Sequence, residues 1–531
     1  MTDLLHNLII NSATRRPEQV ALQHKSSLCS YATLALEVES VAQALLHIGL
    51  GRDERVAIYL PKLPETVISF FAISQAGVVF VPVNPLLKSP QVGYILADCN
   101  VRILITSKER YEQLKEMLPQ RHDLHTIIVV NCTTADLPES TSVNCLAWEA
   151  LRGVGAGRQP HRRIDADMAA ILYTSGSTGK PKGVVLSHKN MVAGAKSVAE
   201  YLHNSPKDRL LAVLPFSFDY GFSQLSTAFY TGATTVLMDY LLPRDVVKMV
   251  ANAQITGLAG VPPLWNQLAE LEWPAEAVNT LRYMTNSGGA MPKTTLTRLR
   301  TSLPNSRFFL MYGLTEAFRS TYLPPEEIDN RPDSMGKAIP NAEIMVVRED
   351  GSGCAPGEPG ELVHRGALVA MGYWNDPAKT AERFKPLPGQ NPALTLTEIA
   401  VWSGDTVKMD DEGYLYFVAR RDEMIKTSGY RVSPTEVEEA IYASQLVGEV
   451  VALGIPHPTL GQAILLVATA NKAGELHPDK IINHCKQQLP NFMVPHAIEQ
   501  RDALPRNPNG KIDRKLLSSE YQNLFDGCKD E

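Results

Sequence analysis

Hydrophobic and polar residues alternate along the first 130 positions in blocks that predict helices and strands in turn. Residues 31–50 place Leu34, Val38, Val41 and Leu45 at helical spacing, and a glycine lies just after the pattern as a stop signal. Short β-branched runs follow at 56–60, 78–81, 101–105 and 127–130, and helix-like segments at 65–76 and 108–118 separate them. This alternation favours a mostly parallel sheet covered by helices.

The pattern changes character twice towards the C-terminus. An α/β pattern continues from about residue 200 to 415, but around 350–375 it becomes rich in glycine, proline and turns, which favours antiparallel strands. The pattern then predicts helices at residues 436–446 and 480–489, and strands at residues 450–455 and 464–468. We therefore predict an α/β fold with three parts: a large N-terminal domain at 1–420, its β-rich subdomain at about 340–420, and a small C-terminal α+β domain at 423–531.

Length, composition and charge agree with a globular enzyme. The chain has 531 residues, more than one core usually holds, and 44% of them are hydrophobic and 20% charged. Fifty-one basic residues against 57 acidic ones give a formal charge of −6, without a basic block. Nucleic acid is therefore not an expected partner.

Cysteine usage and hydropathy favour a cytoplasmic location. The seven cysteines form no CxxC or Cys/His cluster, so neither a disulfide framework nor a zinc site is indicated. The N-terminal decapeptide contains Asp3, His6 and Asn7 and is unlike a secretory signal. Residues 67–83 are interrupted by polar residues and fall short of the roughly 20 apolar residues that a spanning helix needs, so we expect no membrane association.

The stretch 173–183, Tyr-Thr-Ser-Gly-Ser-Thr-Gly-Lys-Pro-Lys-Gly, is a candidate phosphate-binding loop. It follows the apolar run 168–172 directly and offers backbone N–H groups, hydroxyls and two lysines to phosphate oxygens. It is not a Walker A sequence, because Gly176 and Gly179 enclose two residues and not four. A flexible linker is the alternative, but linkers seldom lie between an apolar strand and a helix that starts near Ser187.

This stretch resembles the signature of the AMP-forming adenylating superfamily, which includes acyl-CoA synthetases, luciferases and the adenylation domains of nonribosomal peptide synthetases. Further segments resemble the family's motifs in the same order: Asn286-Ser-Gly-Gly-Ala290, Tyr312-Gly-Leu-Thr-Glu316, Gly360-Glu-Leu-Val-His-Arg-Gly366, Gly372-Tyr-Trp-Asn-Asp376, Ser403-Gly-Asp405, Arg420-Arg-Asp-Glu-Met-Ile-Lys426 and Pro508-Asn-Gly-Lys511. The resemblance covers residues 168–514. It implies an enzyme that joins a carboxylate to the α-phosphate of ATP, releases pyrophosphate and then transfers the acyl group to a thiol.

The resemblance implies a role for each motif residue in binding ATP. Residues expected to hold the β- and γ-phosphates are Thr174, Ser175, Gly176, Ser177, Thr178, Gly179 and Lys182. Thr315 would donate to the α-phosphate and Glu316 would hold Mg²⁺, a cation that suits carboxylate oxygen. In isolation, Thr315 and Glu316 would equally suit an ordinary helix N-terminus. The adenosine would be bound by Gly288, Gly289, Ala290, Tyr312, Gly313, Asp405 and Arg420, with Tyr312 stacked on adenine and Asp405 accepting from the ribose.

Two further residues are implied to serve catalysis through domain movement. Lys511 lies in a turn-forming sequence, Arg-Asn-Pro-Asn-Gly-Lys, and by resemblance bridges carboxylate and phosphate during adenylation. Asp422 is at the position of the family's hinge between the domains, which we place at 421–423. Rotation about it would withdraw Lys511 before the thiol reacts. The family's usual glycine before the hinge arginine is Ala419 here.

The segment Phe218-Asp219-Tyr220-Gly221 is the best indicator of the substrate. It resembles the Phe-Asp signature of amino-acid adenylation domains, whose aspartate pairs with the substrate's ammonium group, and also stand-alone ligases that load proline onto carrier proteins. A carboxylate between two aromatic residues needs a cation, which a bound amine would supply. The alternative is that Asp219 pairs with a lysine or arginine of the protein or caps a helix. We predict an amino acid, with L-proline first.

The chain ends 17 residues after Arg514 without a carrier segment, so we expect the thiol on a separate phosphopantetheinylated carrier protein. Coenzyme A presents the same arm, and a CoA ligase for a fatty or aryl acid is the alternative enzyme. A non-catalytic nucleotide sensor would need a damaged lysine or glutamate, whereas Lys511 and Glu316 are both present.

Overall fold

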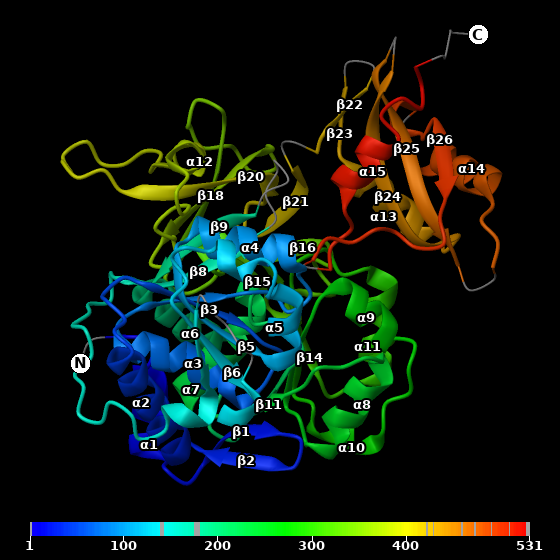
Figure 1. The fold of residues 1–531 in the computed structure, drawn as a ribbon. Helices are drawn as coiled ribbons and strands as arrows, with labels where there is room; N and C mark the ends of the chain where they lie inside the picture. Colours follow the sequence, from blue (N-terminus) through cyan, green and yellow to red (C-terminus); the bar gives the residue numbers. More distant parts are fainter. Residues whose placement is uncertain are drawn as a thin grey trace.

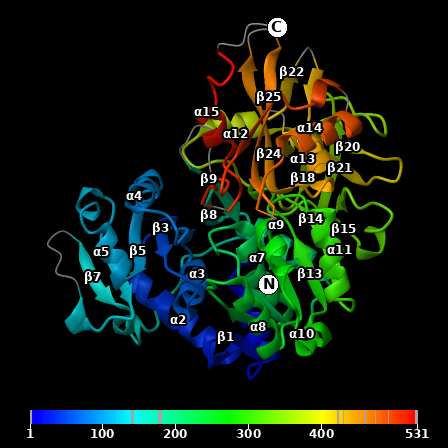
Figure 2. The same cartoon turned by 90° about the vertical axis from the view of Figure 1, so that its right-hand side faces the viewer.

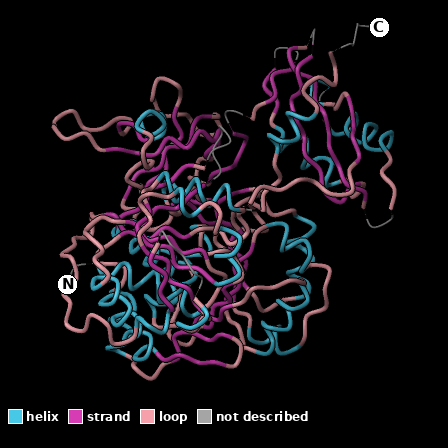
Figure 3. Tube along the Cα trace, in the orientation of Figure 1, coloured by secondary structure: helices cyan, strands magenta, loops and turns pink. Residues whose placement is uncertain are grey.

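The structure is a computed structural model, and it describes residues 3–137, 143–174, 181–420, 423–427, 430–457, 460–471, 474–489, 491–508 and 510–526. Three sheets organise this part of the chain (Figure 1), and Figure 3 shows helices covering them. The fold is the α/β class that the sequence predicts.

The first sheet has the order β7-β6-β5-β3-β4-β8-β9. Its neighbours are parallel except for β8 and β9, which run antiparallel on either side of the candidate phosphate loop. The strands are β3 (Arg55–Tyr59), β4 (Val79–Pro82), β5 (Val101–Ser107), β6 (Thr126–Val130), β7 (Asn144–Ala147), β8 (Met168–Thr174) and β9 (Lys182–Ser187). The helices of this region are α2 (Tyr31–His47), α3 (Pro64–Ala76), α4 (Ser89–Asp98) and α5 (Lys108–Leu114).

The second sheet combines a parallel half with an antiparallel half in the order β17-β18-β20-β21-β16-β15-β14-β13-β12-β10-β11-β1-β2. The parallel half has β1 (Val20–His24), β10 (Arg209–Ala212), β11 (Thr234–Leu237), β12 (Gly257–Gly260), β13 (Tyr283–Asn286) and β14 (Arg307–Tyr312), with β2 (Ser27–Ser30) antiparallel at its edge.

The antiparallel half confirms the β-rich region expected around 350–375. It contains β15 (Thr321–Leu323), β16 (Ser334–Ala338), β17 (Ala342–Val347), β18 (Gly360–Gly366), β20 (Ile399–Met409) and β21 (Leu415–Arg420), and β19 (Phe384–Pro386) pairs with β20. The helices around the second sheet are α1 (Asn7–Arg15), α6 (His188–Tyr201), α7 (Asp219–Thr231), α8 (Pro243–Asn252), α9 (Pro262–Leu268), α10 (Ala275–Thr280), α11 (Lys293–Ser302) and α12 (Pro377–Arg383).

Helices α3 and α7 join the first two sheets into one hydrophobic core. Figure 2 shows α3 between β3 of the first sheet and α7. The Phe70 ring of α3 lies 5.3 Å from that of Phe80 in β4 and 5.5 Å from that of Phe222 in α7. Because buried aromatic side chains contribute large apolar areas, this contact fixes α7 to the first sheet through α3.

The third sheet belongs to the C-terminal unit, which lies above the larger part of the chain in Figure 1. Its strands are β22 (Ile425–Thr427), β23 (Tyr430–Val432), β24 (Val447–His457), β25 (Gly461–Ala470) and β26 (Ala497–Gln500). Helices α13 (Pro434–Ala443), α14 (Pro478–Gln488) and α15 (Arg514–Glu520) accompany them. The unit has its own buried clusters, so its core does not depend on the larger sheets.

Candidate active site

The predicted site residues gather where the parallel strands of the second sheet end. Strands β12, β13 and β14 are parallel neighbours, so their carboxyl ends lie at one edge. The segments 286–290 and 312–316 follow β13 and β14 directly, and α7 begins at Asp219 after β10. In open α/β sheets this edge is the usual place for ligands.

Two residues that the sequence predicts to bind adenosine meet across the two halves of the second sheet. Tyr312, the last residue of β14, donates a hydrogen bond from its hydroxyl to Oδ2 of Asp405 in β20 at 2.5 Å. Arg420 lies opposite Asp405 in the β20–β21 ladder, although its side chain is outside the described atoms. Gly289 and Ala290 are exposed, so the segment after β13 presents an open backbone surface.

Glycine is required at position 288 by the backbone, which has φ +81° there, in the left-handed region. A Cβ on Gly288 would lie 3.5 Å from Cγ1 of Val261 and 3.8 Å from Cε of Lys511. At Gly313, a Cβ would lie 3.4 Å from Cα of Arg319.

Lys182, at the start of β9, and Glu316 are linked through Tyr373. The Lys182 ammonium lies over the Tyr373 ring, 4.9 Å from its centroid, and the Tyr373 hydroxyl donates to Oε1 of Glu316 at 2.6 Å. Burial lowers the pKa of Lys182, and the charge of Glu316 partly opposes that shift. Thr174 ends β8 next to this group. Residues Ser175, Gly176, Ser177, Thr178 and Gly179 lie outside the described residues, as does Asp422.

Lys511 reaches this edge from the C-terminal unit. Its backbone N–H donates to Oδ1 of Asn507, and the Asn507 backbone N–H donates back to the Lys511 carbonyl at 2.8 Å, which closes the predicted turn. Asn84, which is buried just after β4, donates from Nδ2 to the Pro508 carbonyl at 3.0 Å. The turn that carries Lys511 is thus attached to the first sheet.

Asp219 is buried at the first turn of α7, and the protein already supplies a cation for it. The Arg319 guanidinium donates from Nη1 to Oδ2 of Asp219 at 3.3 Å, and the Thr315 hydroxyl donates to Oδ1 at 3.3 Å. Burial raises the pKa of Asp219, whereas the charges of Arg319 and Lys511 oppose that shift. The structure therefore contains the ion pair that sequence reasoning kept as the alternative.

The two aromatic neighbours of Asp219 differ in their surroundings. Tyr220 is fully buried, and its hydroxyl donates to the carbonyl of Thr285 in β13 at 2.8 Å. Phe218 is only partly buried and its Cζ would lie 3.9 Å from a Cβ on Gly288. Phe218 therefore faces the Lys511 side, whereas Tyr220 faces the interior.

Sequence reasoning missed Arg319, Tyr373 and Asn84. A signal for Arg319 was present, because it is an arginine within the apolar stretch after Glu316, and a buried arginine requires a partner. Tyr373 lies inside the motif at 372–376 without an assigned role. Nothing in the local sequence around Asn84 indicates that it contacts a residue more than 400 positions away.

The donor set around Glu316 fits a magnesium ion that shares its ligands with ATP. Mg²⁺ is usually held by one or two carboxylates together with substrate phosphates. No group of three or more His, Cys, Asp or Glu side chains that could hold a metal by itself occurs among the described residues.

Within the described chain, no helix is both long enough and apolar enough to cross a bilayer.

Comparison with known proteins gives matches along almost the whole chain. The chain is 30% identical over 529 residues to an L-proline–(L-prolyl-carrier protein) ligase of Pseudomonas fluorescens, covering 98% of this chain and 99% of that protein. It is 26% identical over 545 residues to a long-chain-fatty-acid–CoA ligase of Bacillus subtilis, covering 98% and 95%. It is also 29% identical over 523 residues to tyrocidine synthase 3 of Brevibacillus parabrevis; this match covers 97% of the chain, but the chain spans only 8% of that protein.

The fold is also that of solved enzymes. ATP-bound MatB from Rhodopseudomonas palustris superimposes with a TM-score of 0.86 over 99% of this chain and 100% of that chain, at 23% identity. The AMP-binding enzyme family matches residues 10–374, and the C-terminal domain of AMP-binding enzymes matches residues 436–511. With the site residues gathered as described, these matches show that the chain belongs to the AMP-binding enzyme family and is an AMP-forming ligase.

Proposed function

We propose that the protein activates an amino acid as its aminoacyl-adenylate and transfers it to the phosphopantetheine thiol of a separate carrier protein. An oxygen of the amino-acid carboxylate attacks the α-phosphorus of ATP, the bond to the bridging oxygen breaks, and pyrophosphate leaves. The thiolate then attacks the acyl carbon, and AMP leaves with the electrons of the acyl–oxygen bond.

Lys511, Lys182 and Thr315 are suited to the first step. Charge accumulates on the reacting oxygens while a carboxylate approaches a polyanion, so preorganised cations and donors lower the barrier most. Lys511 and Thr315 lie beside Asp219, and Lys182 faces Glu316. A magnesium ion bound by Glu316 and the phosphates would neutralise further charge.

The observation that carries the amino-acid assignment is the buried carboxylate of Asp219 beside Lys511. An ionised carboxylate accepts about four hydrogen bonds, so two contacts of 3.3 Å leave it the capacity to accept from a substrate ammonium group. The 30% identical relative is named as a prolyl-carrier protein ligase, which also favours this assignment. A long-chain-fatty-acid–CoA ligase is similar to the chain at 26% identity. Each amino acid is therefore tested together with the matching acid that lacks the amino group.

Domain movement about residues 421–423 is part of the proposal. Strand β21 ends at Arg420 and β22 begins at Ile425, so the two units are joined by a short connection. We propose that the C-terminal unit turns about Asp422 after adenylation and removes Lys511 from the site, so that the thiol can enter.

Matched acids test the substrate class. ATP–pyrophosphate exchange is measured with L-proline against cyclopentanecarboxylate and with L-asparagine against succinamate, in wild type and in Asp219→Asn. We expect wild type to prefer the amino acid of at least one pair on the order of 100-fold, and Asp219→Asn to lose that preference, because an amide cannot pair with ammonium. Equal exchange with both members of each pair, or a preference for fatty or aryl acids, would overturn the proposal.

A further inference from the structure

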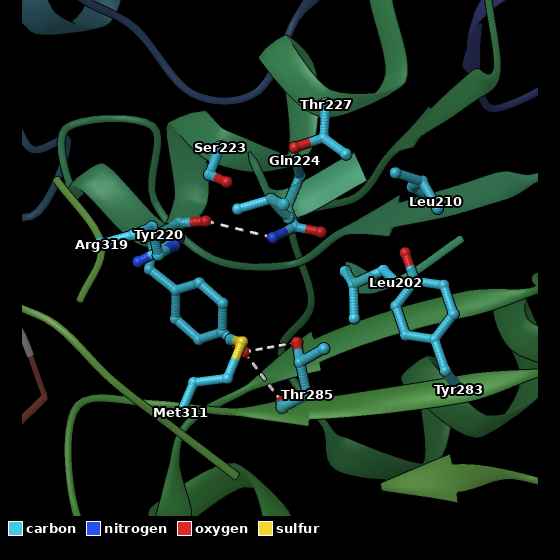
Figure 4. Close-up of a pocket in the computed structure, with 11 residues that line it drawn as sticks. Leu202, Leu210, Tyr220, Ser223, Gln224, Thr227, Tyr283, Thr285, Met311 and Arg319 are labelled. Carbon is cyan, nitrogen blue, oxygen red and sulfur yellow. Dashed lines mark hydrogen bonds between the residues drawn. The ribbon is translucent and has the colours of Figure 1, made fainter. Parts of the chain in front are cut away.

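A small polar cavity of about 10 Å³ lies between α7 and the second sheet (Figure 4), and Arg319 both lines it and pairs with Asp219. Its polar lining consists of Tyr220, Ser223, Gln224, Thr227, Thr285 and Arg319. Four of these side chains, those of Tyr220, Ser223, Gln224 and Thr227, come from one face of α7, and Thr285 comes from β13. Tyr283 and apolar side chains, among them Leu202, Leu210 and Met311, complete the wall (Figure 4).

Arg319 supplies the charge in the lining of this cavity, and it is almost completely buried, with 3% of its side chain exposed. Nη1 is used by Asp219, and the guanidinium carbon lies 4.6 Å from the centroid of the Tyr220 ring. Among the described residues, Nε and Nη2 have no hydrogen-bond partner. Two N–H-bearing nitrogens of a buried guanidinium are therefore available to a ligand.

Two hydroxyls that line the cavity are also unsatisfied. Within the described part of the chain, Ser223 Oγ and Thr227 Oγ1 are buried without a hydrogen-bond partner. Leaving a buried donor unsatisfied costs about 1–3 kcal/mol for each group, and more for charged groups. Such a lining disfavours an alkyl chain, which would satisfy none of these groups.

We propose that Arg319 determines specificity by binding an oxygen in the side chain of the amino-acid substrate. The proposal rests on the proposed function and refines it: Asp219 would take the ammonium group, and Nε and Nη2 of Arg319 an amide, hydroxyl or carboxylate oxygen beyond the α-carbon. Nη1 of Arg319 lies 3.3 Å from Oδ2 of Asp219, so a substrate bound through both residues would carry its oxygen on a short side chain. L-Proline lacks such an oxygen, so we expect it to be a poorer substrate than amino acids that carry one.

Near-isosteric amino acids separate this proposal from a purely structural role. The exchange assay compares kcat/KM for L-asparagine against L-leucine and for L-threonine against L-valine. A site built to hydrogen-bond a substrate oxygen rejects the analogue without it strongly, so we expect a preference of roughly 100-fold or more for one oxygen-bearing member. Arg319→Leu should bring that ratio close to one, and Arg319→Lys, which keeps a cation for Asp219, should lower it at least about tenfold.

Two variants of α7 serve as internal comparison. Thr227→Val removes a cavity hydroxyl but keeps the shape of the side chain. It should lower the ratio of kcat/KM between the oxygen-bearing amino acid and its apolar analogue. Ser226→Ala removes a hydroxyl that donates to the Ser223 carbonyl and does not line the cavity, so its ratio should equal that of wild type. Thr227→Val and Arg319→Lys keep the test valid if Arg319→Leu does not fold.

The outcomes distinguish the two proposals. If wild type uses L-proline, L-leucine or L-valine as well as the oxygen-bearing amino acids, or if no Arg319 variant changes the ratios, the cavity holds only a buried water and this inference is wrong. In either case amino-acid activation still stands. If no amino acid supports exchange but fatty or aryl acids do, the proposed function itself is wrong.

Discussion

At the scale of single residues, several motif residues that we predict to bind ATP lie close together in the fold. Tyr312 and Glu316 lie at and just after the end of β14, and Asp405 of β20 joins them through its hydrogen bond with Tyr312. Lys511 is brought to the same edge by a turn that Asn84 holds just after β4. Motif residues are predictable because each is tied to a local backbone form. The contact of Arg319 was not predictable, because it depends on Asp219, which the fold places beside it.

Replacement of Lys511 by alanine should separate the two half-reactions. We expect adenylation to fall by about 10²–10³-fold or more, because the variant loses a cation aimed at the reacting oxygens. Transfer to carrier protein from supplied aminoacyl-adenylate should proceed at the wild-type rate. A variant that lost both half-reactions equally would contradict the assigned role of Lys511.

A buried histidine should make the protein sensitive to acid. His364 of β18 is fully buried with Nδ1 against the Ser320 hydroxyl, and burial lowers its pKa to about 4. Since the unfolded chain binds a proton near pH 6.5, stability should fall as pH falls from about 6.5 to about 4, by roughly 2–3 kcal/mol from this residue. Urea unfolding of wild type and His364→Gln at pH 7 and pH 4.5 measures the difference; an equal acid loss in both would contradict the prediction.

At the scale of elements, α7 connects substrate recognition to the fold. The helix begins at Asp219, where an acid in the first turn is favoured, and ends at Gly232 in the left-handed conformation. Its third residue, Gly221, lies so close to the preceding loop that a Cβ would come within 2.0 Å of the Pro215 carbonyl oxygen. The glycine of the Phe-Asp-Tyr-Gly segment is thus explained by packing. The sequence predicted the helix-forming regions but not this contact.

Gly221→Ala should displace the start of α7. We expect a loss of about 1–3 kcal/mol in the free energy of unfolding, because the added methyl group overpacks a rigid carbonyl, together with weaker exchange activity. Gly353→Ala is the matched control, because nothing lies within 4 Å of the Cβ position there. Equal stability of the two variants would contradict the packing argument.

At the scale of the whole molecule, the sequence predicted the α/β class, the antiparallel region and the separate C-terminal unit. These follow from periodicities that local sequence carries. It could not predict that one continuous sheet would join the parallel and antiparallel halves, or that the Lys511 turn would be attached to the first sheet. Both depend on contacts between residues distant in sequence.

The contact between Asn84 and Pro508 should favour the arrangement that adenylates. Asn84→Asp keeps the acceptor for the Leu86 N–H but loses the donor to Pro508, and Asn84→Ala loses both. We expect both variants to adenylate about tenfold more slowly, which corresponds to the loss of one hydrogen bond, with unchanged transfer from supplied adenylate. Equal slowing of both half-reactions would show that Asn84 has no part in selecting the arrangement.

The central claim is that an amino acid is activated on the α-phosphate of ATP. The most direct measurement incubates the purified protein with ATP, Mg²⁺ and each of the twenty amino acids, and identifies the products with hydroxylamine as the acceptor. We predict AMP, pyrophosphate and aminoacyl-hydroxamate in equal amounts, only when the right amino acid is present. Formation of ADP and phosphate, or of AMP with fatty or aryl acids alone, would contradict the account.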